Sequence, residues 1–318
     1  LKYNPPSARV LSLLENIFSL WQDNWYINRK QQEIEHNIAY YLQQYQGEDK
    51  PADIWQESVM VRKGWAIRLT LHLLASADYG FRGRRVRLPD GSLAPFCGHA
   101  NHRGEVVYGA DTYRISAEEI IVGAMPNLSL GEGRYVMKYL TDQERQDGFL
   151  ANLSEASGVG HVIPDYEQAL ALGIDGMLQQ IRHYQQSATS AAQRELYLSS
   201  LLALQGVSEY CLRYAALADQ MAAQMNAGQQ LEKHNLQQIA KRMQKLSKAK
   251  PDTFVEAVQF IFTLHTCLHL NGEPTALGRL DQLLQPFFDS DSISLQQAQE
   301  VIDAFYIKLD EKVQQNRI

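Results

Sequence analysis

The stretch of this sequence best suited to chemistry runs from Ser157 to Glu167 and reads Ser-Gly-Val-Gly-His-Val-Ile-Pro-Asp-Tyr-Glu. Its glycines, Gly158 and Gly160, let a backbone approach a ligand closely. His161 can supply a proton near neutral pH, and Asp165, four residues later, can hold a hydroxyl group or a cation. The residues alone leave a second interpretation open, in which Asp165 only N-caps a helix and His161 is a satisfied core residue.

A second polar stretch is Gly278-Arg279-Leu280-Asp281-Gln282. Here the favoured interpretation is structural: Arg279 and Asp281 form a buried ion pair that locks a loop to a helix. No nucleophile or base lies beside them in the sequence, so we predict no catalytic role for this pair.

Two groups of residues resemble parts of metal sites. Cys97, His99 and His102 are close together in the sequence, and His265 and His269 are one helical turn apart with Cys267 between them. Zinc sites need three or four ligands at recognisable spacing, and neither group has that spacing. The sequence therefore predicts no bound metal. It also has no phosphate-binding glycine loop and no strand-turn-helix serine motif.

These stretches need elements to position them, and most of the sequence predicts helix. Apolar residues recur at helical spacing near the N-terminus, and again from Val207 to Met225. Turn glycines and β-prone residues between 81 and 123 predict one or two β-hairpins. We expect a mainly α fold with three parts: helical residues 1–80, a β-hairpin insert at 81–123, and helical residues 124–318.

Helix capping residues mark several expected helix starts. Ser116 with Glu119 predicts a capping box for a short helix, and Asp252 or Thr253 can cap the helix that follows Pro251. Ser294 can cap the last helix, expected from Leu295 to about residue 311.

Composition excludes several classes of protein. The chain has 318 residues, a formal net charge of −6 and three widely spaced cysteines. These values argue against a nucleic-acid-binding protein and against a disulfide framework. No apolar run reaches membrane-spanning length and no signal peptide is visible, so we expect a cytoplasmic protein.

Several stretches, in order, resemble glycyl radical enzymes of the pyruvate formate-lyase and glycerol dehydratase type. The resemblance covers residues 118–309 most specifically, and the first hundred residues only weakly. The stretches that carry it are Glu118 to Gly123, Ser157 to Glu167 with Leu170 and Gly173, Arg213 to Ala218 with Met221 and Ala222, Pro251 to Gln259, Gly278 to Gln282 with Pro286 and Phe287, and Ile307 to Leu309.

The resemblance implies the N-terminal part of a ten-stranded α/β barrel wrapped in helices. It implies a homodimeric enzyme whose glycyl radical is installed by an iron-sulfur activase that uses S-adenosylmethionine. The family's radical residues lie in Gly-Cys-Val/Ile-Glu and Arg-Val-X-Gly-Tyr contexts, and residues 1–318 contain neither. We therefore expect this chain to bind no cofactor and to be inactive alone.

The resemblance also implies that His161 and Asp165 face a small-molecule substrate. His161 favours the dehydratase and lyase branch, because pyruvate formate-lyase itself tends to have arginine there. Glycerol dehydratases carry Glu-Ser-Asn-Gly-His-Ser where this chain has His269-Leu270-Asn271-Gly272-Glu273-Pro274, which argues against glycerol as substrate. We expect an enzyme that eliminates water, an amine or sulfite. The alternatives are an acyl-transferring relative of pyruvate formate-lyase, a non-catalytic helical homologue that acts through protein contacts, and a metal-binding protein.

Overall fold

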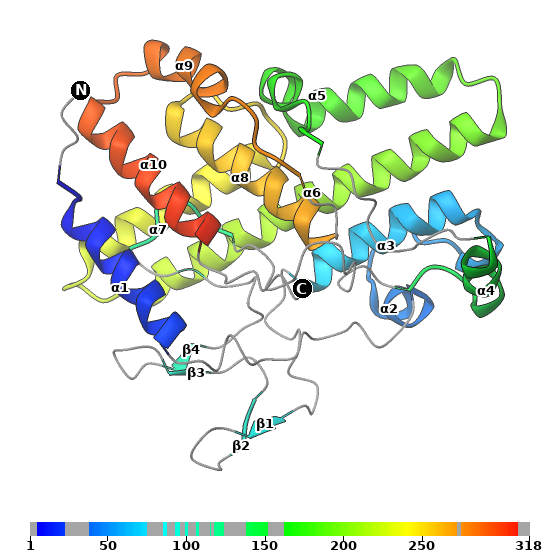
Figure 1. The fold of residues 1–318 in the computed structure, drawn as a ribbon, viewed down its shortest axis with the longest axis horizontal. Helices are drawn as coiled ribbons and strands as arrows, with labels where there is room; N and C mark the ends of the chain where they lie inside the picture. The colour runs from blue at the N-terminus through cyan, green and yellow to red at the C-terminus, as the bar shows by residue number, and fades with distance from the viewer. Residues whose placement is uncertain are drawn as a thin grey trace.

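The part of the chain that the computed structural model describes is mainly helical (Figure 1). The described residues are 5–22, 38–74, 85–87, 93–95, 99–100, 106–107, 115, 118–123, 138–151, 162–271 and 275–310. The helices before residue 160 are α1 (Ala8–Gln22), α2 (Ile38–Gln44), the 3₁₀ helix η1 (Ile54–Gln56), α3 (Val59–Leu74) and α4 (Asp142–Leu150). The later helices are α5 (Tyr166–Gln186), α6 (Ala191–Gln224), α7 (Gln230–Leu246), α8 (Phe254–Leu270), α9 (Leu280–Ser290) and α10 (Leu295–Asp310).

The described strands are short and all lie within the predicted insert. They are β1 (Arg85–Arg87), β2 (Leu93–Pro95), β3 (His99–Ala100) and β4 (Val106–Val107). β1 pairs with β2 and β3 with β4, both antiparallel. Most residues of 81–123 lie outside the described part, so the hairpin insert, the three-part division and the ten-stranded barrel stay predictions.

The long helix α6 organises the fold. It crosses the molecule in Figure 1 and packs against α3, α5 and α7. The predicted apolar stripe is confirmed: Val207, Tyr210, Cys211, Tyr214 and Ala218 are buried. These side chains share one face of α6, and their burial contributes apolar surface to the core.

The α7–α8 connection is held against α5 at Gly173. This residue has φ 64°, a left-handed conformation that interrupts α5 and favours glycine. A Cβ at this position would lie 2.4 Å from the backbone nitrogen of Lys250. The amide of Asp175 then donates to the carbonyl of Lys248 at 2.8 Å. Gly173 thus fixes the residues before Pro251 beside the first turns of α5.

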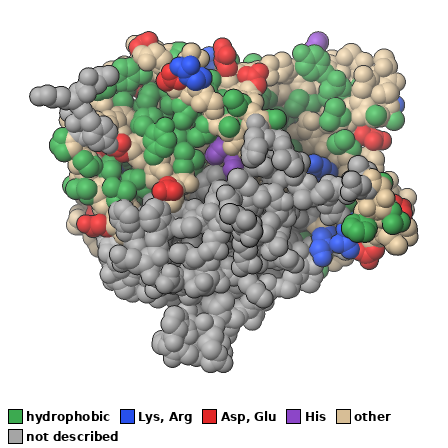
Figure 2. Space-filling model, viewed as in Figure 1, with side chains coloured by type: hydrophobic (Ala, Val, Ile, Leu, Met, Phe, Trp, Pro, Cys, Tyr) green, Lys and Arg blue, Asp and Glu red, His purple; other side chains and the backbone are tan. Residues whose placement is uncertain are grey.

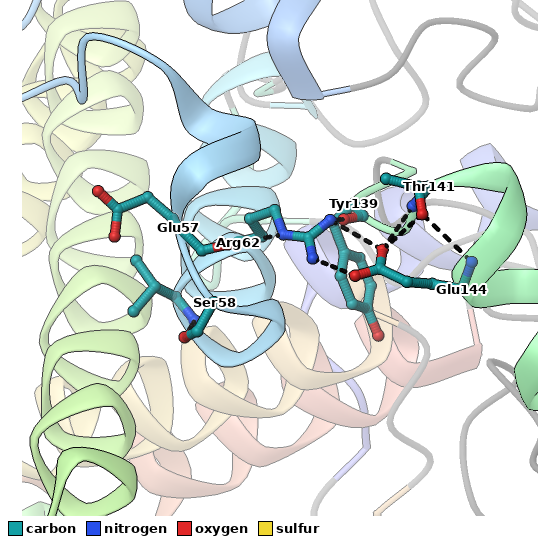
Figure 3. Close-up of polar contacts among 7 residues, drawn as sticks. Glu57, Ser58, Arg62, Tyr139, Thr141 and Glu144 are labelled. Carbon is teal, nitrogen blue, oxygen red and sulfur yellow. Dashed lines mark hydrogen bonds and ion pairs between the residues drawn. The ribbon is translucent and has the colours of Figure 1, made fainter.

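A charged cluster joins α3 to α4 (Figure 3). The guanidinium of Arg62 donates through Nη1 to Oε2 of Glu144 at 2.9 Å and to the carbonyl of Tyr139 at 3.0 Å. Its side chain is 5% exposed. The hydrogen bond from Arg62 lowers the pKa of Glu144 to about 2. Because Glu144 also completes the capping box of α4 with Thr141, one carboxylate serves both contacts.

The segment Glu118–Gly123 differs from its prediction. Ser116 lies outside the described residues, and residues 118–123 form a turn and a bend without helix, so the short helix predicted here is wrong. The carboxylate of Glu119 accepts instead from Nζ of Lys308 on α10 at 3.1 Å. The backbone of Val122 exchanges two hydrogen bonds with the buried carboxamide of Gln259, at 2.8 and 2.9 Å. In this segment, hydrogen bonds to residues far away in the sequence take the place of the predicted local helix cap.

Hydrophobic side chains gather over α8, α9 and α10 on the face shown in Figure 2. The exposed apolar residues of α10 include Leu295, which is 53% exposed, and Tyr306, which is 56% exposed.

Candidate functional site

Asp165 lies at the start of α5 and caps that helix. Its Oδ1 accepts a hydrogen bond from the amide of Gln168 at 2.9 Å. The side chain is exposed, and in the described part of the chain no donor reaches Oδ2. One carboxylate oxygen therefore serves the helix, and the other accepts no bond from any residue that the structure describes.

The other residues of this motif are only partly visible. Gly158, Gly160 and His161 lie outside the described residues, so their predicted roles stay predictions. The following residue, Val162, forms a parallel β-bridge with Thr275, and its carbonyl accepts from the amide of Ala276 at 3.0 Å. The two polar stretches that the sequence singled out are therefore neighbours in the fold.

Gly278 makes this close approach possible. Its φ is 70°, a value that side chains rarely adopt, and a Cβ there would lie 2.9 Å from Cγ2 of Ile163. The loop before α9 can therefore lie directly on the residues that lead into α5.

A cleft of about 600 Å³ opens between the starts of α5 and α9. Asp165 and Glu167 line it, together with two cationic residues, Lys250 and Arg279. Leu170, Leu283, Phe287 and several prolines supply its apolar wall. An apolar cleft with a few convergent charged groups is a usual form of small-molecule site.

Arg279 and Asp281 form the predicted ion pair, but the pair is not buried. Their side chains are 69% and 64% exposed. Arg279 is the N-cap residue of α9 and Asp281 lies in its first turn, so the contact is local and links no separate elements. The bond from Arg279 lowers the pKa of Asp281 to about 2. The prediction of a buried lock was wrong because residues two apart at a helix start bond to each other on the surface.

A buried polar cluster lies behind this region, and the sequence did not single out two of its members, Tyr166 and Thr275. The hydroxyl of Tyr166 and Nδ1 of His265 share a hydrogen bond of 3.1 Å. Oγ1 of Thr275 lies 3.3 Å from the same nitrogen, and Nε2 of His269 accepts from the amide of Thr275 at 3.3 Å. The histidine spacing predicted core or wall residues, and both are buried. Nothing in the sequence linked them to Tyr166.

Both histidines of this cluster are uncharged at neutral pH. Burial, with a smaller contribution from His269, lowers the pKa of His265 to about 3. Burial also lowers the pKa of His269. Burial raises the pKa of Tyr166 to about 12, so its hydroxyl stays protonated. The cluster is therefore a neutral hydrogen-bonded wall.

Because His265 is neutral in the folded chain, we expect the free energy of unfolding to fall at acidic pH. An unfolded histidine has a pKa near 6.5, so the unfolded chain binds the His265 proton more tightly than the folded chain does. The contribution of His265 to stability is complete above pH 6.5 and falls by about 1.4 kcal/mol per pH unit below it, or about 2 kcal/mol by pH 5. We expect His265→Gln to remove that part of the pH dependence in urea unfolding at pH 7 and pH 5. His183→Gln, an exposed histidine on α5, is the control and should behave as wild type. An unchanged pH dependence in His265→Gln would contradict this assignment.

The described residues include no group of three or more histidine, cysteine, aspartate or glutamate side chains able to hold a metal ion. Cys97 and His102 lie outside the described part, as does the side chain of His99. Of the two described cysteines, Cys211 and Cys267, both are buried as free thiols. No described helix is long and apolar enough to cross a membrane.

The family model described as pyruvate formate lyase-like matches residues 112–317, well over half of the sequence. The chain belongs to the pyruvate formate lyase-like family. The matched range contains every stretch after residue 123 that carried the resemblance, and both polar stretches of the site. The recognition made from the sequence is confirmed.

Relatives of this pyruvate formate lyase-like chain are dehydratases by name. It is 28% identical over 173 residues to the (2S)-3-sulfopropanediol dehydratase of Klebsiella oxytoca, covering 51% of this chain and 21% of that protein. It is 26% identical over 165 residues to a probable dehydratase of Escherichia coli K12, covering 48% and 20%. The chain spans about a fifth of the length of these relatives.

Solved structures show the fold. The glycerol-bound, B12-independent glycerol dehydratase of Clostridium butyricum superposes with a TM-score of 0.60 at 18% identity, covering 98% of this chain and 41% of that one. Hydroxyproline dehydratase of Clostridioides difficile gives a TM-score of 0.59 at 16% identity, covering 100% and 41%. The helical arrangement of this chain therefore matches part of the fold of these two dehydratases.

Proposed function

We propose that this chain is the N-terminal portion of a glycyl radical dehydratase or lyase that acts on a small polar substrate. The family match over residues 112–317 carries the proposal, together with relatives that are named dehydratases. Those relatives and neighbours act by name on sulfopropanediol, glycerol, 1,2-propanediol and hydroxyproline, which are all hydroxylated small molecules. The reaction class is loss of water, an amine or sulfite from such a compound.

Asp165 binds the substrate hydroxyl in this proposal, and His161 donates a proton to the departing group. Two observations support the first role: no described residue donates to Oδ2 of Asp165, and Asp165 lines a cleft of about 600 Å³. His161 is four residues away along the chain, and histidine is a side chain that can transfer a proton near neutral pH. The second role rests on the motif alone.

An ionised Asp165 also discriminates between the two enzymatic alternatives. A carboxylate binds a hydroxyl group or an ammonium ion favourably and repels a second carboxylate that lies directly against it. Elimination from a diol therefore fits this residue better than acyl transfer from pyruvate does. The non-catalytic alternative predicts no turnover of any of these compounds.

A protein glycyl radical, installed by an iron-sulfur activase that uses S-adenosylmethionine, supplies the hydrogen abstraction in this family. Residues 1–318 hold neither of the sequence contexts in which the family carries its radical cysteine and glycine. The contribution of this chain is substrate binding and proton transfer, in a protein that we also propose to be a homodimer.

The experiment is a substrate panel on the complete, activated enzyme under anaerobic conditions. The panel is 1,2-propanediol, glycerol, 3-sulfopropanediol and trans-4-hydroxyproline, with pyruvate plus coenzyme A as the acyl-transfer arm. We expect at least one member to lose water, giving an aldehyde from a diol. Formation of formate and acetyl coenzyme A, with no dehydration, would favour the acyl-transfer alternative.

The isolated 318-residue chain is expected to form no glycyl radical. The reason is that it contains no glycine in an Arg-Val-X-Gly-Tyr context. The chain is incubated anaerobically with an activase and S-adenosylmethionine, and its electron spin resonance spectrum is recorded. A glycyl doublet from these residues alone would refute the proposal that the radical glycine lies outside residues 1–318.

A further inference from the structure

Three segments far apart in the sequence meet at the buried cluster of Tyr166, His265, His269 and Thr275. Tyr166 is the first residue of α5, the two histidines belong to the last turns of α8, and Thr275 lies in the loop before α9. Tyr166 is 2% exposed, His265 is 5% exposed and His269 is 9% exposed. The cluster is thus a closed joint between α5, α8 and the loop that leads to α9.

Thr275 joins the segments through both its backbone and its side chain. Its bridge partner is Val162, and the neighbouring amide of Ala276 donates to the carbonyl of Val162 at 3.0 Å. The amide of Thr275 itself is 3.3 Å from Nε2 of His269, and its hydroxyl is 3.3 Å from Nδ1 of His265. The position of Val162 is therefore set from α8 through Thr275.

Tyr166 holds the other end of the same short segment. Its hydroxyl reaches Nδ1 of His265 at 3.1 Å, and Asp165 is the residue directly before it. Residues 162–165 are consequently tied to α8 at both ends, by Thr275 at Val162 and by His265 at Tyr166. Asp165 lies between these two anchors in the chain, its side chain is exposed, and it lines the cleft.

We propose that Tyr166, His265 and Thr275 are positioning residues that act on the substrate through Asp165; Tyr166 borders the same cleft, but its hydroxyl is bonded to His265. The inference rests on the proposed function, in which Asp165 binds the substrate. A bound group must be held within about half an ångström of its productive position, and second-layer hydrogen bonds of this kind provide that restraint.

A merely structural role would have a different signature. The ring of Tyr166 fills the core whether or not it carries a hydroxyl, so Tyr166→Phe keeps the packing and removes one hydrogen bond. A structural role predicts lower stability with unchanged catalysis. A positioning role predicts lower kcat/KM at temperatures where the variant is fully folded.

The test is a double-mutant cycle in the complete, activated enzyme, assayed with the best diol of the panel. Tyr166→Phe is combined with Asp165→Asn, and Tyr184→Phe, an exposed tyrosine at the other end of α5, is the matched control. We expect Tyr166→Phe to lower kcat/KM about tenfold in the parent enzyme and less than twofold in the Asp165→Asn background. Tyr184→Phe should leave it unchanged.

Two variants at Thr275 and two at His265 test the same role without relying on Tyr166→Phe. Thr275→Val and His265→Leu should reproduce the loss, whereas Thr275→Ser and His265→Asn, which keep a polar atom near the same place, should recover most of it. An equal loss from Tyr166→Phe in both backgrounds, or no loss while Asp165→Asn is impaired, would overturn the positioning role. Wild-type activity in Asp165→Asn alone would overturn the substrate role of Asp165, and the positioning role with it.

Discussion

Asp165→Asn in the complete enzyme is expected to lower kcat/KM about a hundredfold while the melting temperature stays within about 1 °C of wild type. Asparagine caps helices about as well as aspartate does, so the bond to the amide of Gln168 survives. The change acts at Oδ2, where an amide NH₂ replaces a charged acceptor. A substrate hydroxyl that donated to the carboxylate loses a charge-assisted hydrogen bond, worth about 1.5–3 kcal/mol.

Asp175→Asn is the matched control for this variant. Asp175 is an exposed aspartate on the same helix, and we place it in no site. The two variants are compared by steady-state kinetics and by thermal unfolding. If Asp165→Asn and Asp175→Asn turn over substrate equally, Asp165 is a helix cap and nothing more.

Lys308→Met is expected to cost about 3–5 kcal/mol of folding free energy. Lys308 and Glu119 are 4% and 6% exposed, and their atoms Nζ and Oε1 are 3.1 Å apart. Oε2 of Glu119 has no hydrogen-bond partner among the described residues. Removal of the lysine therefore leaves a buried carboxylate without its counter-charge, which is far more costly than losing the attraction itself.

The double variant Lys308→Met/Glu119→Leu separates these two effects. Because it removes both charges, it should be more stable than Lys308→Met alone. Lys241→Met, an exposed lysine on α7, serves as the control and should change stability by no more than about 0.5 kcal/mol. Urea unfolding measures all three variants. If Lys308→Met is as stable as Lys241→Met, the ion pair of Lys308 and Glu119 is not buried in solution.

Sequence reasoning predicted the features that local rules decide. Thr253 with Glu256 caps α8, and Ser294 with Gln297 caps α10, because a cap needs only residues three apart. The buried stripe of α6 follows from helical periodicity alone. The cap formed by Asp165 was one of the two interpretations that the sequence left open.

Contacts between distant segments were beyond that reasoning. Glu119 was assigned to a local cap, but its partner Lys308 is 189 residues away. Tyr166 forms a hydrogen bond with His265, which is 99 residues away in the sequence, and no local sequence pattern predicts that contact. The prediction for Arg279 and Asp281 was wrong in the opposite sense. We expected a buried pair that joins a loop to a helix, and the pair is local and exposed. The catalytic interpretation of the site came from the resemblance, because one aspartate at a helix start has the same local pattern whether or not it binds a substrate.

The most direct test of the proposed function is to detect a glycyl radical in the complete enzyme. The protein that contains this chain is activated anaerobically with its activase and S-adenosylmethionine, frozen, and examined by electron spin resonance, with the 318-residue chain as control. We predict a glycyl doublet in the complete protein, dehydration of a small hydroxylated substrate, and neither in the control. A complete protein that gives no doublet with an activase proven active on another substrate enzyme would contradict the account and favour a non-catalytic homologue.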